Sequence, residues 1–161
     1  MYKIIGEINS KDILDYYLSI ENKIAWNDNG PKGKQSGIQY ARNEDPYLSA
    51  TGRARLIDKN FDKLNVIYNN TIIEAIVKQY NLFRTRWMWI NAFSCYSIHN
   101  DYSPRIHIPL VTNLQCLFLF PPDQTFHLEI NNVYYVDTTK KHTFINCSEQ
   151  PRLHLVGAVL S

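Results

Sequence analysis

The second half of the chain is a series of short apolar runs, and their spacing constrains the fold more than any other feature. From Arg84 onward, aromatic and β-branched segments are separated by Pro, Asn or Asp every few residues. Such runs predict β-strands, and their regular spacing predicts a sandwich, jelly roll or barrel. The runs are RTRWMWINAFSCYSI (84–98), RIHIPLV (105–111), LQCLFLF (114–120), TFHLEI (125–130), VYYVD (133–137), HTFIN (142–146) and RLHLVGAVL (152–160).

The N-terminal part predicts helices and a long loop instead. A short strand is expected over 1–7, then an amphipathic helix over 10–24 capped by Ser10, and a second helix over 61–80. Between the helices, the 26–56 segment is rich in Gly, Pro, Asn and Asp, which predicts a loop of the kind that serves as a lid or specificity element. The whole is an α+β pattern, in which the helices cover one face of a β-sandwich.

Size, charge and cysteines limit the classes of function. At 161 residues the chain is long enough for one domain with its own core. A formal net charge of +2 is too small to argue for nucleic acid or a membrane surface, and no apolar run has the length of a membrane span. Cys95, Cys116 and Cys147 are widely spaced, which predicts buried free thiols rather than disulfides. Without a signal-peptide pattern at the N-terminus, we expect a cytoplasmic protein that does not bind a membrane.

Histidine placement concentrates any chemistry in the second half, because all five histidines follow residue 98. In His99-Asn100-Asp101, residues i and i+2 of an extended segment project to one side, so an imidazole and a carboxylate can bind one cation together. A third histidine from a distant strand would complete the 2-His-1-carboxylate set that favours non-haem Fe(II) and leaves open coordination positions. His142, at the start of a later strand, is the leading candidate.

Two Arg-x-His pairs accompany this set: Arg105 with His107, and Arg152 with His154. Each pair shares one face of its strand, and we expect the two strands to line one polar cavity. A guanidinium inside a barrel needs an anionic partner, and a dicarboxylate between the metal and Arg152 would supply it. His154 is open between lining the cavity and a satisfied core histidine, and His127 is assigned no role.

The order of these motifs resembles the aspartyl/asparaginyl β-hydroxylase-like branch of the Fe(II)/2-oxoglutarate-dependent dioxygenases. The resemblance covers Trp87 to Ser161 and rests on His99-x-Asp101, RIHIPL (105–110), HTFIN (142–146) and RLHLV (152–156). It implies a double-stranded β-helix, of the jelly-roll or cupin-like kind, with the N-terminal helices on one sheet. In this single domain, 87–161 would form the core with the metal and cosubstrate site, and 1–86 the supporting and substrate-selecting region.

The resemblance also implies an activity: a hydroxylase that inserts oxygen from O2 into an unactivated C–H bond while 2-oxoglutarate is decarboxylated to succinate and CO2. Ascorbate is the expected in vitro additive. The favoured substrate is an amino acid, free or within a peptide, with the β-carbon of Asp, Asn or a related side chain as target. The implied roles are Fe(II) ligation by His99, Asp101 and His142, pairing of Arg152 with the distal carboxylate of 2-oxoglutarate, and placement of Arg105 and His107 near its metal-bound end.

One departure from the family pattern is a turn before the distal histidine, where Asn131-Asn132 replaces a common glycine. Asn tolerates positive φ, so the turn can survive. Residues 1–86 carry no family motif, and with the 26–56 loop and Arg105 they are expected to set the substrate. The sequence does not give the oligomeric state.

Two other functions are open. One is a dioxygenase acting on a nucleobase or another small metabolite, since basic residues interleaved with aromatic ones could form a positive rim on which bases stack. The other is a jelly-roll binding module without catalysis. The rim residues would be Lys32, Lys34, Arg53, Arg55, Arg84 and Arg86, with Tyr40, Tyr47, Trp87 and Trp89.

Overall fold

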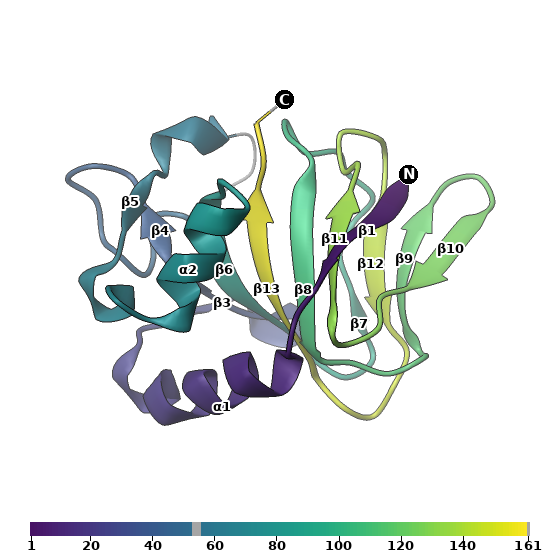
Figure 1. Cartoon of the computed structure of the whole chain (residues 1–161). Helices are drawn as coiled ribbons and strands as arrows, with labels where there is room; N and C mark the ends of the chain where they lie inside the picture. The colour runs from purple at the N-terminus through teal and green to yellow at the C-terminus, as the bar shows by residue number, and fades with distance from the viewer. Residues whose placement is uncertain (53–55, 161) are drawn as a thin grey trace.

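The computed structural model describes residues 1–52 and 56–160, and its main feature is a pair of facing antiparallel sheets (Figure 1). The larger sheet has seven strands in the order β1-β11-β8-β13-β6-β3-β2, and the smaller has four in the order β10-β9-β12-β7. From β6 onward the chain crosses from one sheet to the other at each connection except the β9–β10 hairpin. This path is that of a double-stranded β-helix and confirms the expected jelly-roll fold.

The strands of the β-helix coincide closely with the apolar runs of the sequence. They are β6 (Phe83–Ile90), β7 (Ser94–Cys95), β8 (Arg105–Val111), β9 (Cys116–Phe120), β10 (Gln124–His127), β11 (Asn132–Val136), β12 (Thr143–Asn146) and β13 (Arg152–Ala158).

Strands from the N-terminal region extend the large sheet on both sides. β1 (Tyr2–Glu7) pairs with β11, while β3 (Gly33–Gly37) pairs with β6 and carries β2 (Asn27–Asp28) at the outer edge. The prediction that 26–56 forms one long loop is therefore wrong over β3. Its sequence, GKQSG, has no apolar residue to signal a strand, and its extended form comes from hydrogen bonding to β6.

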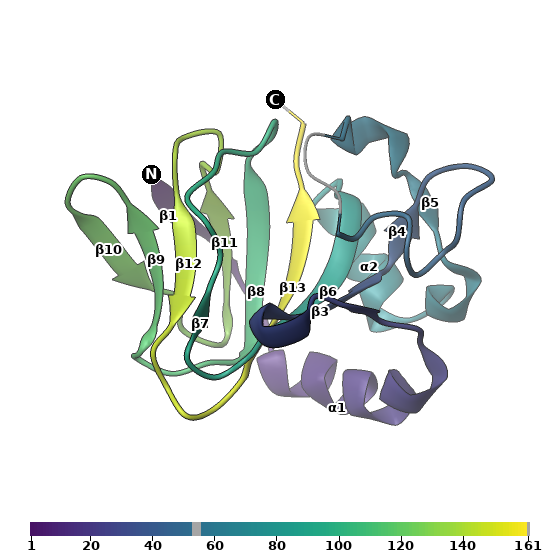
Figure 2. The ribbon, with the colours of Figure 1, turned by 180° about the vertical axis from the view of Figure 1, so that it is seen from behind.

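Two helices, α1 (Ser10–Ile20) and α2 (Ile72–Gln79), pack on the outer face of the large sheet, opposite the small sheet (Figures 1 and 2). The first helix is capped by Asn9, whose side chain accepts from the second and third backbone N–H groups after it, so the predicted Ser10 cap is wrong by one residue. The Ser10 hydroxyl instead donates to the carbonyl of Pro109 at 2.8 Å, which ties α1 to β8.

The predicted helix over 61–80 is wrong in its first half. The segment contains β5 (Lys63–Leu64), which pairs with β4 (Gln39–Tyr40), and a 3-10 turn, before α2 begins at Ile72. Asn70 has φ of 58°, a left-handed conformation that ends the preceding turn, and Thr71 then caps the new helix. The spacing of apolar residues is compatible with one long helix, but it gives no sign that the chain turns at Asn69-Asn70-Thr71.

Alternation along the central strands sorts the two faces of the large sheet. One set of side chains packs beneath the helices and is apolar, and the other points into the space between the sheets and is strongly polar. The outer set is Trp87, Ile106, Ile108, Leu110, Leu153 and Leu155, in one core with Ile13, Tyr17 and Ile73. The inner set includes Arg86, Arg105, His107, Arg152 and His154, all buried.

Smaller expectations divide between confirmed and wrong. Asn131 adopts φ of 67°, as expected for an asparagine in place of glycine at that turn. All three cysteines are free, but only Cys116 is buried, so the predicted burial is wrong for the exposed Cys95 and Cys147. Across residues 1–52 and 56–160, none of the helices combines the length and apolar character needed to cross a membrane.

Candidate metal centre and its cavity

His99 and His142 lie side by side because β7 and β12 are neighbours in the small sheet. Pairing of these strands continues beyond Cys95 until His99 and His142 form an antiparallel bridge, with reciprocal N–H to carbonyl distances of 2.9 and 2.8 Å. Asp101 follows two residues later, and its backbone N–H donates to the carbonyl of Thr138 at 2.8 Å. Backbone hydrogen bonds thus hold both segments where their side chains meet.

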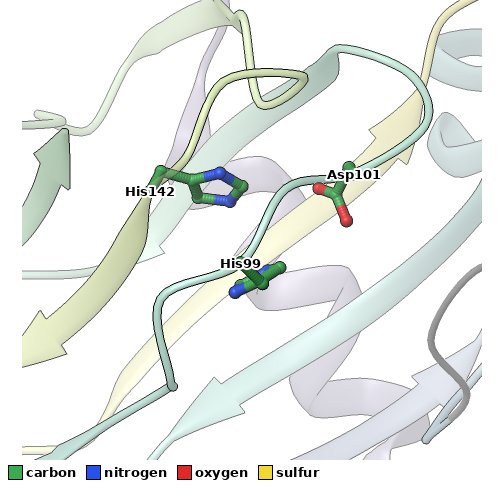
Figure 3. A group of neighbouring side chains, drawn as sticks. All are labelled: His99, Asp101 and His142. Carbon is green, nitrogen blue, oxygen red and sulfur yellow. The ribbon is translucent and has the colours of Figure 1, made fainter. Parts of the chain in front are cut away.

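The two imidazoles and the carboxylate turn toward one shared space (Figure 3). One potential ligand atom from each of His99, Asp101 and His142 lies within 4.8 Å of the others. The structure therefore brings together the three residues that the sequence singled out for metal binding.

Hydrogen bonds also set which imidazole nitrogen is available. Nδ1 of His99 lies 2.7 Å from the carbonyl oxygen of Ser97, and Nδ1 of His142 lies 2.9 Å from that of Lys140. A carbonyl oxygen only accepts, so Nδ1 carries the proton in each ring and Nε2 keeps its lone pair. This arrangement is typical of metal-binding histidines, whose other nitrogen donates to a carbonyl or carboxylate.

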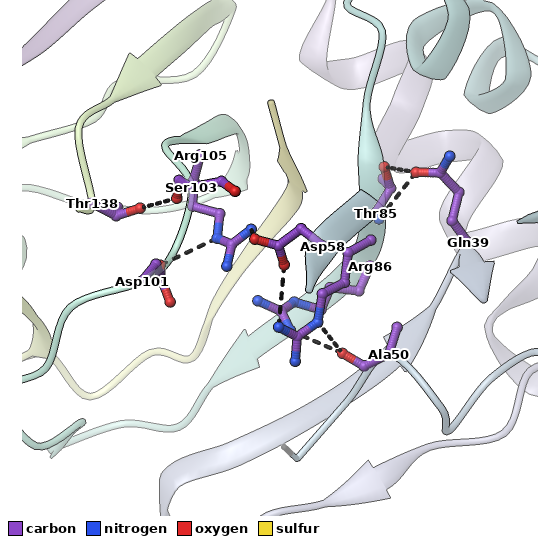
Figure 4. Close-up of polar contacts among 10 residues, drawn as sticks. Gln39, Ala50, Asp58, Thr85, Arg86, Asp101, Ser103, Arg105 and Thr138 are labelled. Atoms are coloured by element: carbon purple, nitrogen blue, oxygen red, sulfur yellow. Dashed lines mark hydrogen bonds and ion pairs between the residues drawn. The ribbon is translucent and has the colours of Figure 1, made fainter. Parts of the chain in front are cut away.

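Asp101 is held by a chain of buried ion pairs (Figure 4). Arg105 donates from Nε to Oδ2 of Asp101 at 3.1 Å, and its Nη1 lies 3.0 Å from Oδ2 of Asp58. The other oxygen of Asp58 accepts from Arg84 at 3.2 Å. Asp58 belongs to the short 3-10 turn over Asp58–Asn60, so this chain links the N-terminal region to the candidate ligand Asp101.

The charges around Asp101 determine its ionisation. Burial by itself would raise the pKa of Asp101, but Arg105, and then Arg86 and His142, outweigh it and lower the pKa to about 2. Burial lowers the pKa of His142 below its ordinary value. At neutral pH the centre therefore presents an ionised carboxylate and a neutral imidazole, both in the form that binds a metal ion.

Among residues 1–52 and 56–160, Arg152 at the start of β13 is buried without an anionic partner. Its exposed fraction is 1%, its Nε and Nη1 have no hydrogen-bond partner, and its guanidinium lies over the ring of Phe144 at 3.6 Å. Burial lowers the pKa of Arg152 to about 9, so the group still carries its charge at neutral pH. A buried cation of this kind is costly unless a ligand pairs with it.

His107 and His154 contact each other on adjacent strands, with their Nδ1 atoms 3.4 Å apart. Burial lowers the pKa of both rings well below the ordinary value, so both are neutral at pH 7. His107 lines the cavity described below, whereas His154 lies behind it against His107 and Phe144. His127 is partly buried at the far side of the small sheet, with its Nδ1 3.0 Å from the carbonyl oxygen of Cys116.

A cavity of 1040 Å³ joins these groups between the sheets. The triad, Arg105, His107 and Arg152 all line it, as do Arg84, Arg86 and the exposed side chains of Ile98 and Tyr102. The space is large enough for a metal ion, a small diacid and a further small molecule.

The predicted positive rim is wrong for Arg84 and Arg86, whereas Lys32 is exposed and lines the cavity as predicted. Arg84 and Arg86 are buried in the cavity rather than on a rim, because both lie on the inner face of β6. Trp87 is fully buried in the core under the helices, and Lys34 lies over Trp26. Arg53 and Arg55 fall outside the described residues.

Arg84 and Arg86 of the cavity lining, and Asp58 behind it, were missed as site residues. Arg84, Arg86, Met88 and Ile90 alternate with Trp87 and Trp89, and this pattern could have placed both arginines on the inner face. Asp58 has no comparable signal, because a single aspartate in a polar turn resembles any surface residue.

The donor set fits a divalent first-row metal. One imidazole nitrogen from each histidine and one carboxylate oxygen converge, Nδ1 of each ring is hydrogen-bonded to a carbonyl, and the carboxylate is oriented by a guanidinium. Three protein ligands leave further coordination positions open, as in other 2-His-1-carboxylate sites.

No protein-family model matches the chain, and no curated protein matches it in sequence. Solved structures do match its fold. A 2OG-Fe(II) oxygenase family oxidoreductase from Burkholderia pseudomallei aligns over 90% of this chain and 76% of its own, with a TM-score of 0.55 and 13% identity. DMSP lyase DddQ from Ruegeria pomeroyi DSS-3 aligns over 97% and 66%, with a TM-score of 0.55 and 11% identity. IDO from Bacillus thuringiensis aligns over 98% and 88%, with a TM-score of 0.52 and 15% identity. At these identities the likeness is one of fold.

Proposed function

We propose that this protein is an Fe(II)/2-oxoglutarate-dependent dioxygenase that hydroxylates an unactivated C–H bond of an amino acid. The observation that carries the proposal is the convergence of His99, Asp101 and His142 in the same cavity as the buried, unpaired guanidinium of Arg152. A metal-binding triad alone fits many functions, but a triad together with a buried anion site fits a chelating diacid. One of the proteins with this fold is described as a 2OG-Fe(II) oxygenase family oxidoreductase, which supports the proposal.

In this function, Nε2 of His99, Nε2 of His142 and the carboxylate of Asp101 hold the iron. The carbonyl oxygens behind the two rings fix their tautomer and orientation, so no proton must leave an imidazole when metal binds. Arg105 holds the Asp101 carboxylate in its ionised form through the bond from Nε to Oδ2. Bound Fe(II) supplies the redox chemistry that activates dioxygen.

Arg152 binds the distal carboxylate of 2-oxoglutarate by a charge-assisted, bidentate contact, for which its Nε and Nη1 donors are free. Phe144 covers one face of the guanidinium and limits the directions from which an anion can approach. His107 is neutral and lines the same cavity, and by the resemblance it would lie near the metal-bound end of the cosubstrate. Overall, one oxygen atom of O2 enters succinate and the other enters the product, with CO2 released.

The motif order noted in the sequence supports the aspartyl/asparaginyl β-hydroxylase-like branch, with the β-carbon of Asp, Asn or a related side chain as the site of hydroxylation. A nucleobase substrate is less favoured, because Arg84 and Arg86 are buried and Trp87 lies in the core under the helices. Of the predicted rim, Lys32 remains exposed and lines the cavity.

The test is succinate formation from 2-oxoglutarate with Fe(II), ascorbate and a panel of amino acids and peptides. We expect succinate with the wild-type protein, none with His99→Ala, and none at moderate 2-oxoglutarate with Arg152→Ala. Arg42→Ala is the matched control, since Arg42 is exposed and far from the cavity lining. Metal binding without succinate formation across the panel would contradict the proposal and favour a jelly-roll binding module.

A further inference from the structure

Arg86 is, like Arg152, a buried guanidinium of the cavity that has an unpaired donor. The proposed binding of metal and 2-oxoglutarate does not use it. It lies on the inner face of β6, opposite Gly37 of β3 and Val156 of β13, at the centre of the large sheet. Its exposed fraction is 9%, and it lines the same cavity as the metal ligands. A charged side chain is rare at such a central position unless something pairs with it.

The partners of Arg86 do not neutralise it. Nη1 donates to the carbonyl of Ala50 at 3.0 Å, whereas Nε is buried and has no hydrogen-bond partner. Across residues 1–52 and 56–160, Arg86 forms no ion pair with a carboxylate. Burial, followed by the nearby charges of Arg84 and Arg105, lowers its pKa to about 9, so the side chain remains charged at neutral pH.

The nearby carboxylates are already engaged by other arginines. Asp58 uses one oxygen for Arg84 and the other for Arg105, and Oδ2 of Asp101 accepts from Arg105. Metal binding would engage Asp101 further, and Fe(II) with doubly charged 2-oxoglutarate adds no net charge. One buried positive charge therefore stays uncompensated at this end of the cavity even in the cosubstrate complex.

This charge is separate from the one at Arg152. Arg152 pairs in register with Ile90 and Arg86 pairs with Val156, so the two backbone positions are four residues apart along the same pair of strands. At a rise of ~3.3 Å per residue, the separation along the strands is about 13 Å. Neither guanidinium is among the charges that shift the pKa of the other, so the two charges lie apart in the cavity.

We propose that Arg86 binds a carboxylate of the substrate, so that the substrate is an acid. A free amino acid supplies this group with its α-carboxylate, and a residue within a peptide supplies it only through an acidic side chain. Ile98 and Tyr102, which flank His99–Asp101 in the sequence, line the same cavity with exposed fractions of 58% and 63%. They offer an apolar contact to the remainder of the substrate. The inference rests on the proposed function and narrows its substrate class.

The experiment measures binding rather than turnover. Free L-amino acids and aliphatic carboxylic acids, each with its primary carboxamide, are titrated into the full-length protein by calorimetry. The titrations are run with Mn(II) and 2-oxoglutarate and repeated without either. We expect at least one acid to bind, with its carboxamide about 10- to 100-fold weaker, the loss typical of one charge-assisted contact.

Variants separate the two anion positions. Arg86→Met should lower the affinity for the acid to that for its carboxamide. Arg86→Lys should give an intermediate affinity, because lysine keeps the charge without the planar guanidinium. Arg42→Met, at an exposed position, should leave the affinity unchanged. Arg152→Met should instead lower the affinity for 2-oxoglutarate. In urea without ligand, Arg86→Met should be at least as stable as wild type, since it removes an unpaired buried charge; this shows that lost binding is not lost folding.

Three results would overturn the inference. They are that no acid in the panel binds, that acid and carboxamide bind with equal affinity, or that Arg86→Met lowers the affinity for 2-oxoglutarate as much as Arg152→Met does. If the protein binds neither Mn(II) nor 2-oxoglutarate but still binds the acid more tightly than its carboxamide, the dioxygenase assignment alone is refuted. If the protein binds Mn(II) and 2-oxoglutarate but does not bind the acid more tightly than its carboxamide, the role of Arg86 alone is refuted.

Discussion

Arg105 and Arg152 are buried to a similar degree on the inner face of the large sheet, yet their surroundings are opposite. Arg105 is bound by the carboxylates of Asp58 and Asp101, whereas Arg152 has an aromatic ring on one face and unpaired donors. A buried charge with protein partners stabilises an arrangement, and one without partners is retained for a ligand. The comparison therefore separates the end of the cavity that holds the candidate metal ligands from the end that, in the proposed function, receives the cosubstrate.

The largest expected effect comes from breaking the paired end. Asp58→Asn leaves Arg84 and Arg105 without the carboxylate between them, and removing one partner of a buried ion pair costs about 3–5 kcal/mol of unfolding free energy. Urea denaturation measures it. Asp62→Asn is the control, since the exposed Asp62–Lys63 pair at 3.7 Å contributes about 0–1 kcal/mol. Equal stability of the two variants would mean that Asp58 does not organise this end.

A smaller effect is expected on the metal. Arg105→Met removes the bond that orients Asp101, and loss of such a supporting contact lowers metal affinity about 10- to 100-fold. Fe(II) or Mn(II) titration of the variant measures it, beside Arg42→Met. Unchanged affinity would show that Asp101 needs no positioning by Arg105.

The unpaired end should respond with the opposite sign. Arg152→Met removes a buried charge that has no partner, so we expect the ligand-free protein to gain about 1 kcal/mol of unfolding free energy. The same variant should lose the stabilisation that 2-oxoglutarate gives the wild-type protein. Urea denaturation with and without 2-oxoglutarate measures both. Destabilisation of the ligand-free variant would place Arg152 with the structural arginines and erase the contrast.

The smallest expected effect concerns Phe144. Phe144→Leu removes the ring that lies 3.6 Å from the Arg152 guanidinium, and a cation–π contact of about 0.5–1 kcal/mol corresponds to roughly a two- to five-fold loss in 2-oxoglutarate affinity. Calorimetric titration resolves a change of this size. A loss as large as that of Arg152→Met would mean that the ring, not the guanidinium, dominates the site.

Local pattern predicted the part of the site that depends on strand alternation. The two Arg-x-His pairs could be placed on strand faces, because a period of two fixes which side chains point inward. The same reasoning brought His99 and Asp101 to one side, although both lie beyond the end of β7. The jelly-roll path then brings His142 beside His99, although 43 positions separate them in the chain, and this follows from topology rather than from any local signal.

The contacts that the sequence could not predict are long-range pairings. Asp58 meets Arg84 and Arg105 only after three segments fold together, and no property of LIDKN indicates this. β3 was hidden for a similar reason, since its hydrogen bonds to β6 and not its composition make it a strand. Arg86 was visible as an inward residue of β6 but was interpreted as part of a surface rim.

The most direct test is a crystal structure of the protein with Mn(II) and 2-oxoglutarate under anaerobic conditions. We predict one metal ion bound by Nε2 of His99, Nε2 of His142 and the carboxylate of Asp101, with 2-oxoglutarate chelating it and its far carboxylate on Arg152. A metal bound elsewhere, or a diacid that leaves Arg152 unpaired, would contradict the account.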